Sequence, residues 1–306
     1  MMRFVSIGEC MLELASAGGE LWRLGIAGDT LNTAWYARAC LPSDWAVAYG
    51  TCIGTDEVSQ RIPKFLAENG IGTDRVLTHP TRSVGLYLIS LTKGERSFSY
   101  WRETSAARTL ADDPDQLLAL TAEAQILHVS GITLAILPPA GRTALIDVLR
   151  QRKSEGAMIS FDPNLRPKLW ENLQIAADTL TEMARVSTVV LPSFDDERRA
   201  FGDTSPRDTI NRYAALGAES VVVKNGGAEV LGHQNGETQI FDHFEQVEPV
   251  DTTGAGDSFN GAFLAAIATG APLAQAVGLG HQVAAQVIGQ KGALIPMETI
   301  KRQARN

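Results

Sequence analysis

Short apolar runs recur along this chain, and segments long enough to form helices separate most of them. The runs are residues 4–7, 46–53, 126–129, 158–161, 188–191 and 220–224. A connection that contains a helix joins two strands by a crossover and makes them parallel members of one sheet. Parallel sheets are covered by helices on both faces. The sequence therefore predicts an α/β fold with a mainly parallel central sheet between two helical layers.

One segment departs from this alternation. Residues 83–91 and 97–102 are two extended runs around a polar turn, a pattern that favours a β-hairpin. The hairpin stands where a further helix is expected, so we interpret it as part of a small β lid formed by segments 10–27 and 83–104. Because the chain has no low-complexity linker and no internal repeat, we expect a single domain over residues 1–306 that carries this lid.

Composition narrows the classes of partner. The 306-residue chain has a formal net charge of −8, which argues against a general binder of nucleic acid or of an acidic membrane surface. Its three cysteines fit neither a disulfide framework nor a zinc site and are typical of buried thiols in a reducing compartment. The N-terminus has a strand pattern instead of a cleavable signal, and the apolar runs are shorter than a membrane span. We expect a cytoplasmic protein that binds small molecules.

The most informative segment is residues 251–260, Asp-Thr-Thr-Gly-Ala-Gly-Asp-Ser-Phe-Asn, which predicts the start of a helix. Gly254, Ala255 and Gly256 form its opening turn, where unpaired backbone N–H groups and the helix dipole favour an anion. Two glycines lower helix stability, and the close approach of an anion gives a reason for them. Asp257 follows and is placed to take the proton of a hydroxyl that attacks a phosphoryl group. The alternative is that Asp257 only complements the helix dipole.

We expect the helix dipole and the N–H donors to keep Asp257 ionised at neutral pH. An ionised carboxylate is a weak base. Phosphoryl transfer tolerates a weak base because its loose transition state depends mainly on positioning and on charge stabilisation.

Residues 251–259 resemble the C-terminal signature of the ribokinase-like carbohydrate kinases, the phosphofructokinase-B group. The likeness covers the whole chain, including the glycine and polar residues at 28–32 and the Lys-Asn-Gly-Gly segment at 224–227. It implies a ribokinase-like three-layer sandwich, ATP with Mg²⁺, Asp257 as the base, and the amides of residues 254–257 as the site of the transferring phosphoryl group. It also implies a monovalent cation such as K⁺ beside Asp251 and Thr253.

Within that family, residues 28–33, 100–103 and 161–170 resemble the kinases of 2-keto-3-deoxygluconate. Strand alternation places Tyr100 and Arg102 on one face of the lid hairpin, and Tyr87 of the facing strand can project into the same cleft. A sugar acid requires a guanidinium group, because arginine binds carboxylate bidentately, whereas a neutral sugar does not. We therefore interpret Arg102 and Arg166 as ligands of an acid group. Structural ion pairs are the alternative for both arginines, as packing is for the tyrosines.

The resemblance also implies roles for the remaining candidate site residues. It implies that the sugar contacts Gly28, Asp29 and Asn32, although Asp29 is equally suited to cap the following helix. ATP is placed at Asn164, Arg166, Lys224, Gly226, Gly254, Gly256 and His281. The acidic motif that orients the Mg²⁺ waters corresponds to Ser193-Phe-Asp-Asp196, followed by Glu197. Which of Asp196 and Glu197 has this role stays open, and a solvated helix start is the alternative for both.

Together these features predict an ATP-dependent kinase that converts 2-keto-3-deoxygluconate to 2-keto-3-deoxy-6-phosphogluconate. One alternative is a kinase of a neutral sugar or a nucleoside with the same fold. Another is a sugar or nucleotide sensor without catalytic activity. The exposed face of the lid hairpin also favours a homodimer or a larger homo-oligomer. The choice between gluconate- and galactonate-derived acids is left open.

Overall fold

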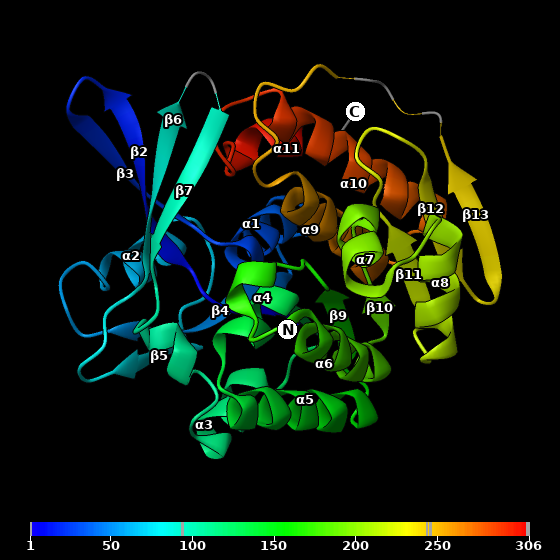
Figure 1. The fold of residues 1–306 in the computed structure, drawn as a ribbon, viewed down its shortest axis with the longest axis horizontal. Helices are drawn as coiled ribbons and strands as arrows, with labels where there is room; N and C mark the ends of the chain where they lie inside the picture. The colour runs from blue at the N-terminus through cyan, green and yellow to red at the C-terminus, as the bar shows by residue number, and fades with distance from the viewer. Residues whose placement is uncertain (1, 93–94, 243, 245–246, 304–306) are drawn as a thin grey trace.

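The central element of the fold is a nine-stranded sheet with the strand order β13-β12-β11-β10-β9-β8-β1-β4-β5 (Figure 1). The structure is a computed structural model that describes residues 2–92, 95–242, 244 and 247–303. The strands are β1 (Met2–Ile7), β4 (Trp45–Gly54), β5 (Val76–His79), β8 (Ile126–Ser130), β9 (Met158–Asp162), β10 (Val189–Val190), β11 (Ser220–Val223), β12 (Val230–Gln234) and β13 (Glu237–Phe241). The pairs from β11 to β5 are parallel, and β12 and β13 add antiparallel at one edge. The predicted mainly parallel sheet is confirmed.

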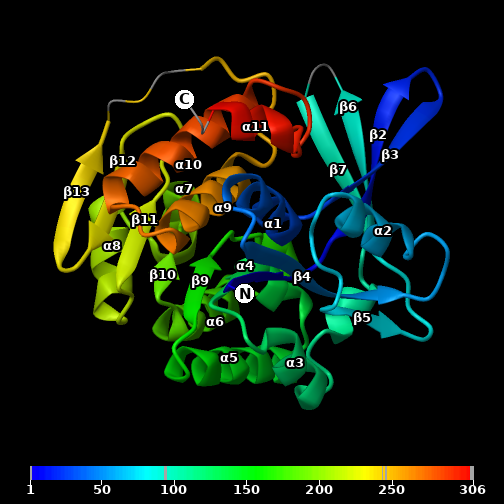
Figure 2. The ribbon, with the colours of Figure 1, turned by 180° about the vertical axis from the view of Figure 1, so that it is seen from behind.

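Helices cover both faces of this sheet, as Figures 1 and 2 show from opposite sides. Alternate strand residues point to opposite faces, so Phe4 of β1 packs in one core and Val5 in the other. The first core contains residues of α1 (Asp29–Cys40), α2 (Arg61–Glu68), α9 (Ala255–Ala268), α10 (Leu273–Ile288) and α11 (Met297–Gln303). The second contains residues of α3 (Pro114–Thr121), α4 (Gly131–Ile136), α5 (Pro139–Ser154), α6 (Leu173–Val186) and α8 (Pro206–Ala215), with α7 (Phe194–Phe201) packed beside it. The three-layer sandwich is confirmed.

Within the described residues, no helix combines the length and the apolar character needed to cross a bilayer.

A second sheet of four strands stands to one side of the helical layers (Figure 1). Its order is β3-β2-β6-β7, with β2 (Met11–Gly18), β3 (Leu21–Ala27), β6 (Leu86–Thr92) and β7 (Glu95–Trp101). The hairpin predicted near residue 90 is β6 and β7, while its turn residues 93 and 94 lie outside the described residues. A second hairpin, β2 and β3, joins it through the parallel pair β2 and β6. This sheet is consistent with a lid, and we call it the lid sheet.

Close packing of α1 against α9 brings the starts of these two helices together. Gly261 of α9 lies against the α1 backbone, where an added Cβ would come within 2.5 Å of Thr33 O and 2.8 Å of Ala37 N. A side chain at this position cannot be accommodated without a shift of backbone. The contact sets the separation of the two helices and so the distance between residues near their N-termini.

We predict that Gly261→Ala destabilises the protein by roughly 1–3 kcal/mol, because the methyl group forces α1 and α9 apart. Chemical unfolding at pH 7 measures the change. Gly278→Ala on α10 is the matched control, since a Cβ there meets nothing within 4 Å. It should be neutral or stabilising, because alanine favours a helix interior over glycine. Equal effects of the two substitutions would contradict the packing argument.

Candidate active site

The first turn of α9 has the backbone geometry of an anion site. Gly254 is the N-cap residue, with a φ of 78°. A Cβ there would come 2.9 Å from Ala293 O, so glycine is required by both conformation and space. The amides of Gly256 and Asp257 belong to the first turn and have no intrahelical acceptors. Their N–H groups therefore point outward at the positive end of the helix dipole.

Asp257 lies in this turn and contacts the start of α1. Its Oδ2 accepts a hydrogen bond of 2.8 Å from Asn32 Nδ2, and its backbone oxygen accepts one of 3.3 Å from Thr33 Oγ1. Burial, followed by the nearby charge of Asp29, raises the pKa of Asp257 to about 7, while the hydrogen bond from Asn32 opposes this shift. The expectation that the helix dipole and the N–H donors keep Asp257 ionised at neutral pH is therefore wrong, because desolvation and a like charge outweigh them and raise its pKa to about 7. A carboxyl group that titrates near neutrality is a better general base than an ordinary aspartate.

Behind this turn lies a buried group of three side chains. Lys224 Nζ is 2.8 Å from Asp162 Oδ2 and 3.0 Å from Asn260 Oδ1, and Asn260 Nδ2 donates to the same oxygen of Asp162 at 2.6 Å. Lys224 was predicted at the nucleotide, and the structure places its ammonium group among protein side chains. Sequence reasoning did not select Asp162 or Asn260, although Asp162 lies in a segment that resembles the kinase family and Asn260 directly follows another.

Asn164 connects this group to the start of α1. It has a φ of 34°, its backbone N–H donates to Asp162 Oδ1 at 3.1 Å, and its Nδ2 donates to Asp29 Oδ2 at 2.9 Å. The N-cap residue of α1 is Gly28, with no side-chain cap, so Asp29 does not cap the helix as the alternative reading had it. Asn164 was predicted at ATP, and here its side chain holds Asp29, which was predicted at the sugar.

The lid sheet carries a row of aromatic rings on one face. The rings of Tyr87 and Tyr100 are 5.8 Å apart, and that of Phe98 is 6.2 Å from each of them. Burial, followed by the charge of Glu13, raises the pKa of Tyr87, and the charge of Asp257 adds to this shift. Arg102 lies at the end of the row, with its guanidinium carbon 5.8 Å from the Tyr100 ring centroid. The predicted shared face is confirmed.

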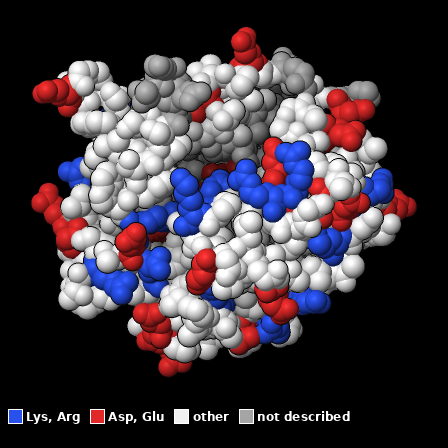
Figure 3. All heavy atoms as spheres, viewed as in Figure 1, with Lys and Arg blue, Asp and Glu red and all other residues white. Residues whose placement is uncertain are grey.

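Arg102 and Arg166 both have acidic partners in the structure. Arg102 forms a buried ion pair with Glu9, a residue that sequence reasoning did not select. Arg166 is half-exposed and its Nη1 lies 3.7 Å from Asp196 Oδ2. A hollow lies beside the lid sheet in Figure 3, with lysine and arginine side chains along its rim. The structural ion pair considered for Arg102 is therefore present, although Glu9 occupies only part of its hydrogen-bonding capacity.

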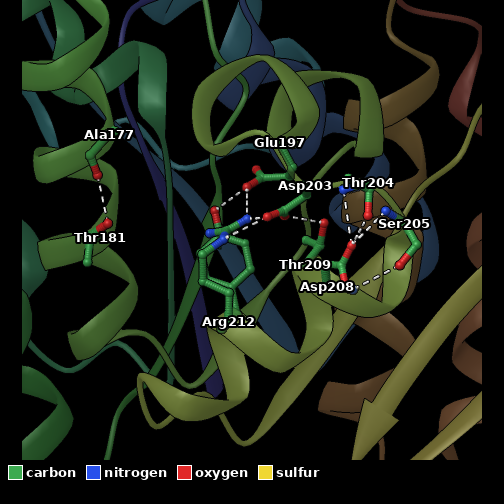
Figure 4. A network of polar contacts seen from close by, with 10 residues as sticks. Ala177, Thr181, Glu197, Asp203, Thr204, Ser205, Asp208, Thr209 and Arg212 are labelled. Atoms are coloured by element: carbon green, nitrogen blue, oxygen red, sulfur yellow. Dashed lines mark hydrogen bonds and ion pairs between the residues drawn. The ribbon is translucent and has the colours of Figure 1, made fainter.

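The two acids at the start of α7 have different surroundings. Glu197 is buried and accepts hydrogen bonds from Arg212 Nη2 at 2.7 Å and Tyr213 Oη at 2.8 Å, in the cluster of Figure 4. Asp196 is partly exposed and faces Arg166, and burial raises its pKa. Among the described residues, no three His, Cys, Asp or Glu side chains are grouped closely enough to hold a metal ion. Mg²⁺ needs only one or two carboxylates beside waters and substrate phosphates, and Asp196 fits that requirement while Glu197 is engaged elsewhere.

The remaining predicted residues are Asp251, Thr253, Gly226 and His281. Asp251 Oδ1 accepts from Thr253 Oγ1 at 2.7 Å, and its Oδ2 accepts from the Gly292 amide at 2.6 Å. Gly226, with a φ of 60°, lies in the turn after β11. The His281 ring on α10 stacks on Phe244, with centroids 3.9 Å apart.

A carboxyl group with a raised pKa, next to a helix start with outward-pointing amides, is an arrangement suited to phosphoryl transfer to a hydroxyl. Residues 1–300 match the profile described as the pfkB family carbohydrate kinases. The chain belongs to this family of sugar kinases.

Two curated relatives align with almost the whole length of this chain. The chain is 38% identical over 306 residues to the 2-dehydro-3-deoxygluconokinase of Haemophilus influenzae, with 96% of each chain covered. It is 35% identical over 301 residues to the enzyme of that name from Dickeya dadantii, with 96% of this chain and 97% of the relative covered. Among solved structures, the 2-dehydro-3-deoxygluconokinase of Thermotoga maritima superposes with a TM-score of 0.85 at 18% identity, with 100% of each chain covered. A putative ribokinase II of Escherichia coli, in complex with ATP and Mg²⁺, also gives 0.85, at 21% identity and with 100% of this chain and 99% of that one covered. The two structures support the fold.

We predict that Asp257→Asn stabilises the protein at pH 8 and not at acidic pH. The pKa of Asp257 is raised from 3.8 to about 7 on folding. The stability that its protonated form contributes is therefore complete below about pH 4 and is lost as the pH rises through 7. Asparagine removes this loss, so the melting temperature should exceed that of the wild type by about 2 °C or more at pH 8, with the difference fading toward pH 4. The exposed Asp147 provides the control Asp147→Asn. A constant difference between variant and wild type at all pH values would exclude the raised pKa.

Proposed function

We propose that the protein transfers the γ-phosphoryl group of ATP to the C6 hydroxyl of 2-dehydro-3-deoxygluconate, also called 2-keto-3-deoxygluconate, giving the 6-phosphate. The names of the relatives support this substrate, and one observation carries it. The Nε atom of Arg102 is buried and has no hydrogen-bond partner among the described residues. A buried, unpaired guanidinium N–H beside the aromatic row is a site for an anionic group of the substrate.

In this proposal the residues of the site divide the chemistry between them. Asp257 takes the hydroxyl proton, and the amides of residues 254–257 stabilise the transferring phosphoryl group. Arg102 and Arg166 bind the acid, Tyr87 and Tyr100 line the pocket, and Gly28, Asp29 and Asn32 contact the sugar. ATP lies along Asn164, Arg166, Gly226 and His281.

Metal ions complete the nucleotide side of the proposal. Mg²⁺ bound with ATP neutralises phosphate charge, and Asp196 orients its waters. A monovalent cation such as K⁺ binds beside Asp251 and Thr253, whose mutual hydrogen bond fixes the loop before α9. The lid sheet closes over the site to exclude water from ATP. Cys10 and Cys52 are buried thiols, which suits a reducing compartment, and we infer a cytoplasmic location for the protein.

The test of this proposal is a panel of 2-keto-3-deoxy acids, neutral sugars and nucleosides in a coupled assay of ADP release. We expect the sugar acid to be preferred. Arg102→Met should lower kcat/KM for the acid by about 100-fold, because one partner of a buried charged contact is removed, with the KM for ATP nearly unchanged. Arg150→Met, at an exposed position of α5, is the control.

Three results would overturn parts of the proposal. Preference for a neutral sugar or nucleoside would replace the substrate. Unchanged kinetics of Arg102→Met would remove the assignment of the acid group. Absence of any acceptor-dependent ADP release, or full activity of Asp257→Asn, would favour a non-catalytic sensor.

The outer face of the lid sheet supports a homo-oligomer. Leu12, Leu86 and Trp101 share a row on the face opposite the aromatic rings. Trp22 and Trp101 are 46% and 57% exposed. Leu12 is buried, and exposed tryptophans such as Trp22 and Trp101 on one face of a sheet are typical of a self-complementary contact.

We predict that Trp101→Glu shifts the protein toward the monomer, because the interface would bury an unpaired charge. Light scattering after size-exclusion chromatography measures the mass. Leu173→Glu introduces the same charge at an apolar residue of α6 that is 44% exposed. A wild-type monomer, or an equal effect of both substitutions, would contradict an interface on the lid sheet.

A further inference from the structure

Three polar side chains from separate parts of the chain meet behind the first turn of α9. Asp162 ends β9, Lys224 follows β11, and Asn260 belongs to α9; their exposed fractions are 4%, 8% and 1%. The hydrogen bonds among them join all three, so the buried ammonium group has a carboxylate and an amide oxygen as fixed partners. A charged pair at this depth is costly unless its geometry is held in this way.

The position of Lys224 relative to the anion site is set by Gly256. A Cβ added to Gly256 would lie 3.4 Å from Lys224 Nζ. The absent side chain of this glycine therefore leaves the ammonium group close beside the first turn of α9. Asp257 is the next residue along the same turn.

We propose that Lys224, held by Asp162 and Asn260, is a positioning residue that acts through Asp257, because its positive charge is fixed beside the turn that carries this carboxyl group. The inference rests on the proposed function only in taking Asp257 as the base. Lys224 contacts neither the sugar nor the reacting atoms in this role.

The charges around Asp257 act in opposite directions. Asp29 from α1 and Asp162 from β9 disfavour its ionised form, and Lys224 favours it. Asn32 from α1 donates a hydrogen bond to the carboxylate. Burial raises the pKa of Tyr36 of α1 and of Tyr87 of the lid sheet, and Asp257 adds to both shifts, so both tyrosines are neutral near this carboxyl group. The two members of the Asp162–Lys224 pair therefore have effects of opposite sign on one carboxyl group.

Because Lys224 and Asp162 have opposite effects on Asp257, removing each charge should give shifts of opposite sign, which a general loss of structure does not produce. Lys224→Met and Asp162→Asn both break the same ion pair, so both should lower the melting temperature. The acidic limb of the kcat/KM profile, measured from about pH 5 to 9, should move up by about 0.5–1 pH unit in Lys224→Met and down by a similar amount in Asp162→Asn. The double variant lacks both charges, so its limb should return close to that of the wild type, and it also serves if one single variant does not fold.

Arg142→Met is the matched control. Arg142 has a side chain 9% exposed and is paired with Glu171, on α5 and away from α9. It should lose stability without moving the limb. Shifts in the same direction, or no shift, in the two single variants would overturn the inference. So would a higher KM for ATP in Lys224→Met with an unmoved limb, since that result indicates direct contact with the nucleotide. If the sugar acid fails as substrate, the proposed function fails, and the same profiles with the acceptor that is used still decide the role of Lys224.

Discussion

The contact between α1 and α9 is the interaction on which the site depends. Gly261 lets the two backbones approach, and this approach brings Asn32 within hydrogen-bonding distance of Asp257. Helix α1 follows β3 near the N-terminus, and α9 follows β13 near the C-terminus. Only tertiary packing therefore brings the two helices together. The sheet supplies the rest of the geometry, because β9 and β11 end beneath the first turn of α9 and deliver Asp162 and Lys224 to it.

Electrostatics at this site work against the stability of the fold. Asp29, Asp162 and Asp257 converge in a region with little water, and Lys224 is the basic group that offsets them. Burial and the neighbouring carboxylates raise the proton affinity of Asp257, which suits a base that must hold a proton during transfer. The surrounding packing must offset the loss of stability that the buried carboxylates cause, as is usual where a functional site conflicts with folding.

Much of the fold follows from the sequence, because the signals are local. Apolar runs, helix-length connections and the glycines at 254 and 256 each act over a few residues, and they were sufficient for the parallel sheet, the lid hairpin and the start of α9. The partners of charged groups were not accessible in this way. Glu9 and Arg102, or Asp162 and Lys224, are far apart along the chain, and their pairing depends on how the strands are ordered. The pKa of Asp257 was misjudged for the same reason, since it depends on Asp29 and on burial.

The two acids of α7 mark the limit of motif reasoning. Asp196 and Glu197 are adjacent and chemically similar, yet a helix turns successive side chains about 100° apart. One faces Arg166 and the other enters the cluster with Arg212 and Tyr213. The orientation of α7 about its own axis decides which of the two acids meets which partners.

The ion pair of Glu9 and Arg102 has a mechanical consequence. Glu9 lies in the connection from β1 to β2, and Arg102 follows β7. The ion pair therefore ties together, at the base of the lid sheet, two of the connecting segments that link this sheet to the rest of the domain. In the proposed function, the acid group of the substrate binds Arg102 at Nε and shares the guanidinium with Glu9, so occupation of the site is coupled to the contact at the base of the lid sheet.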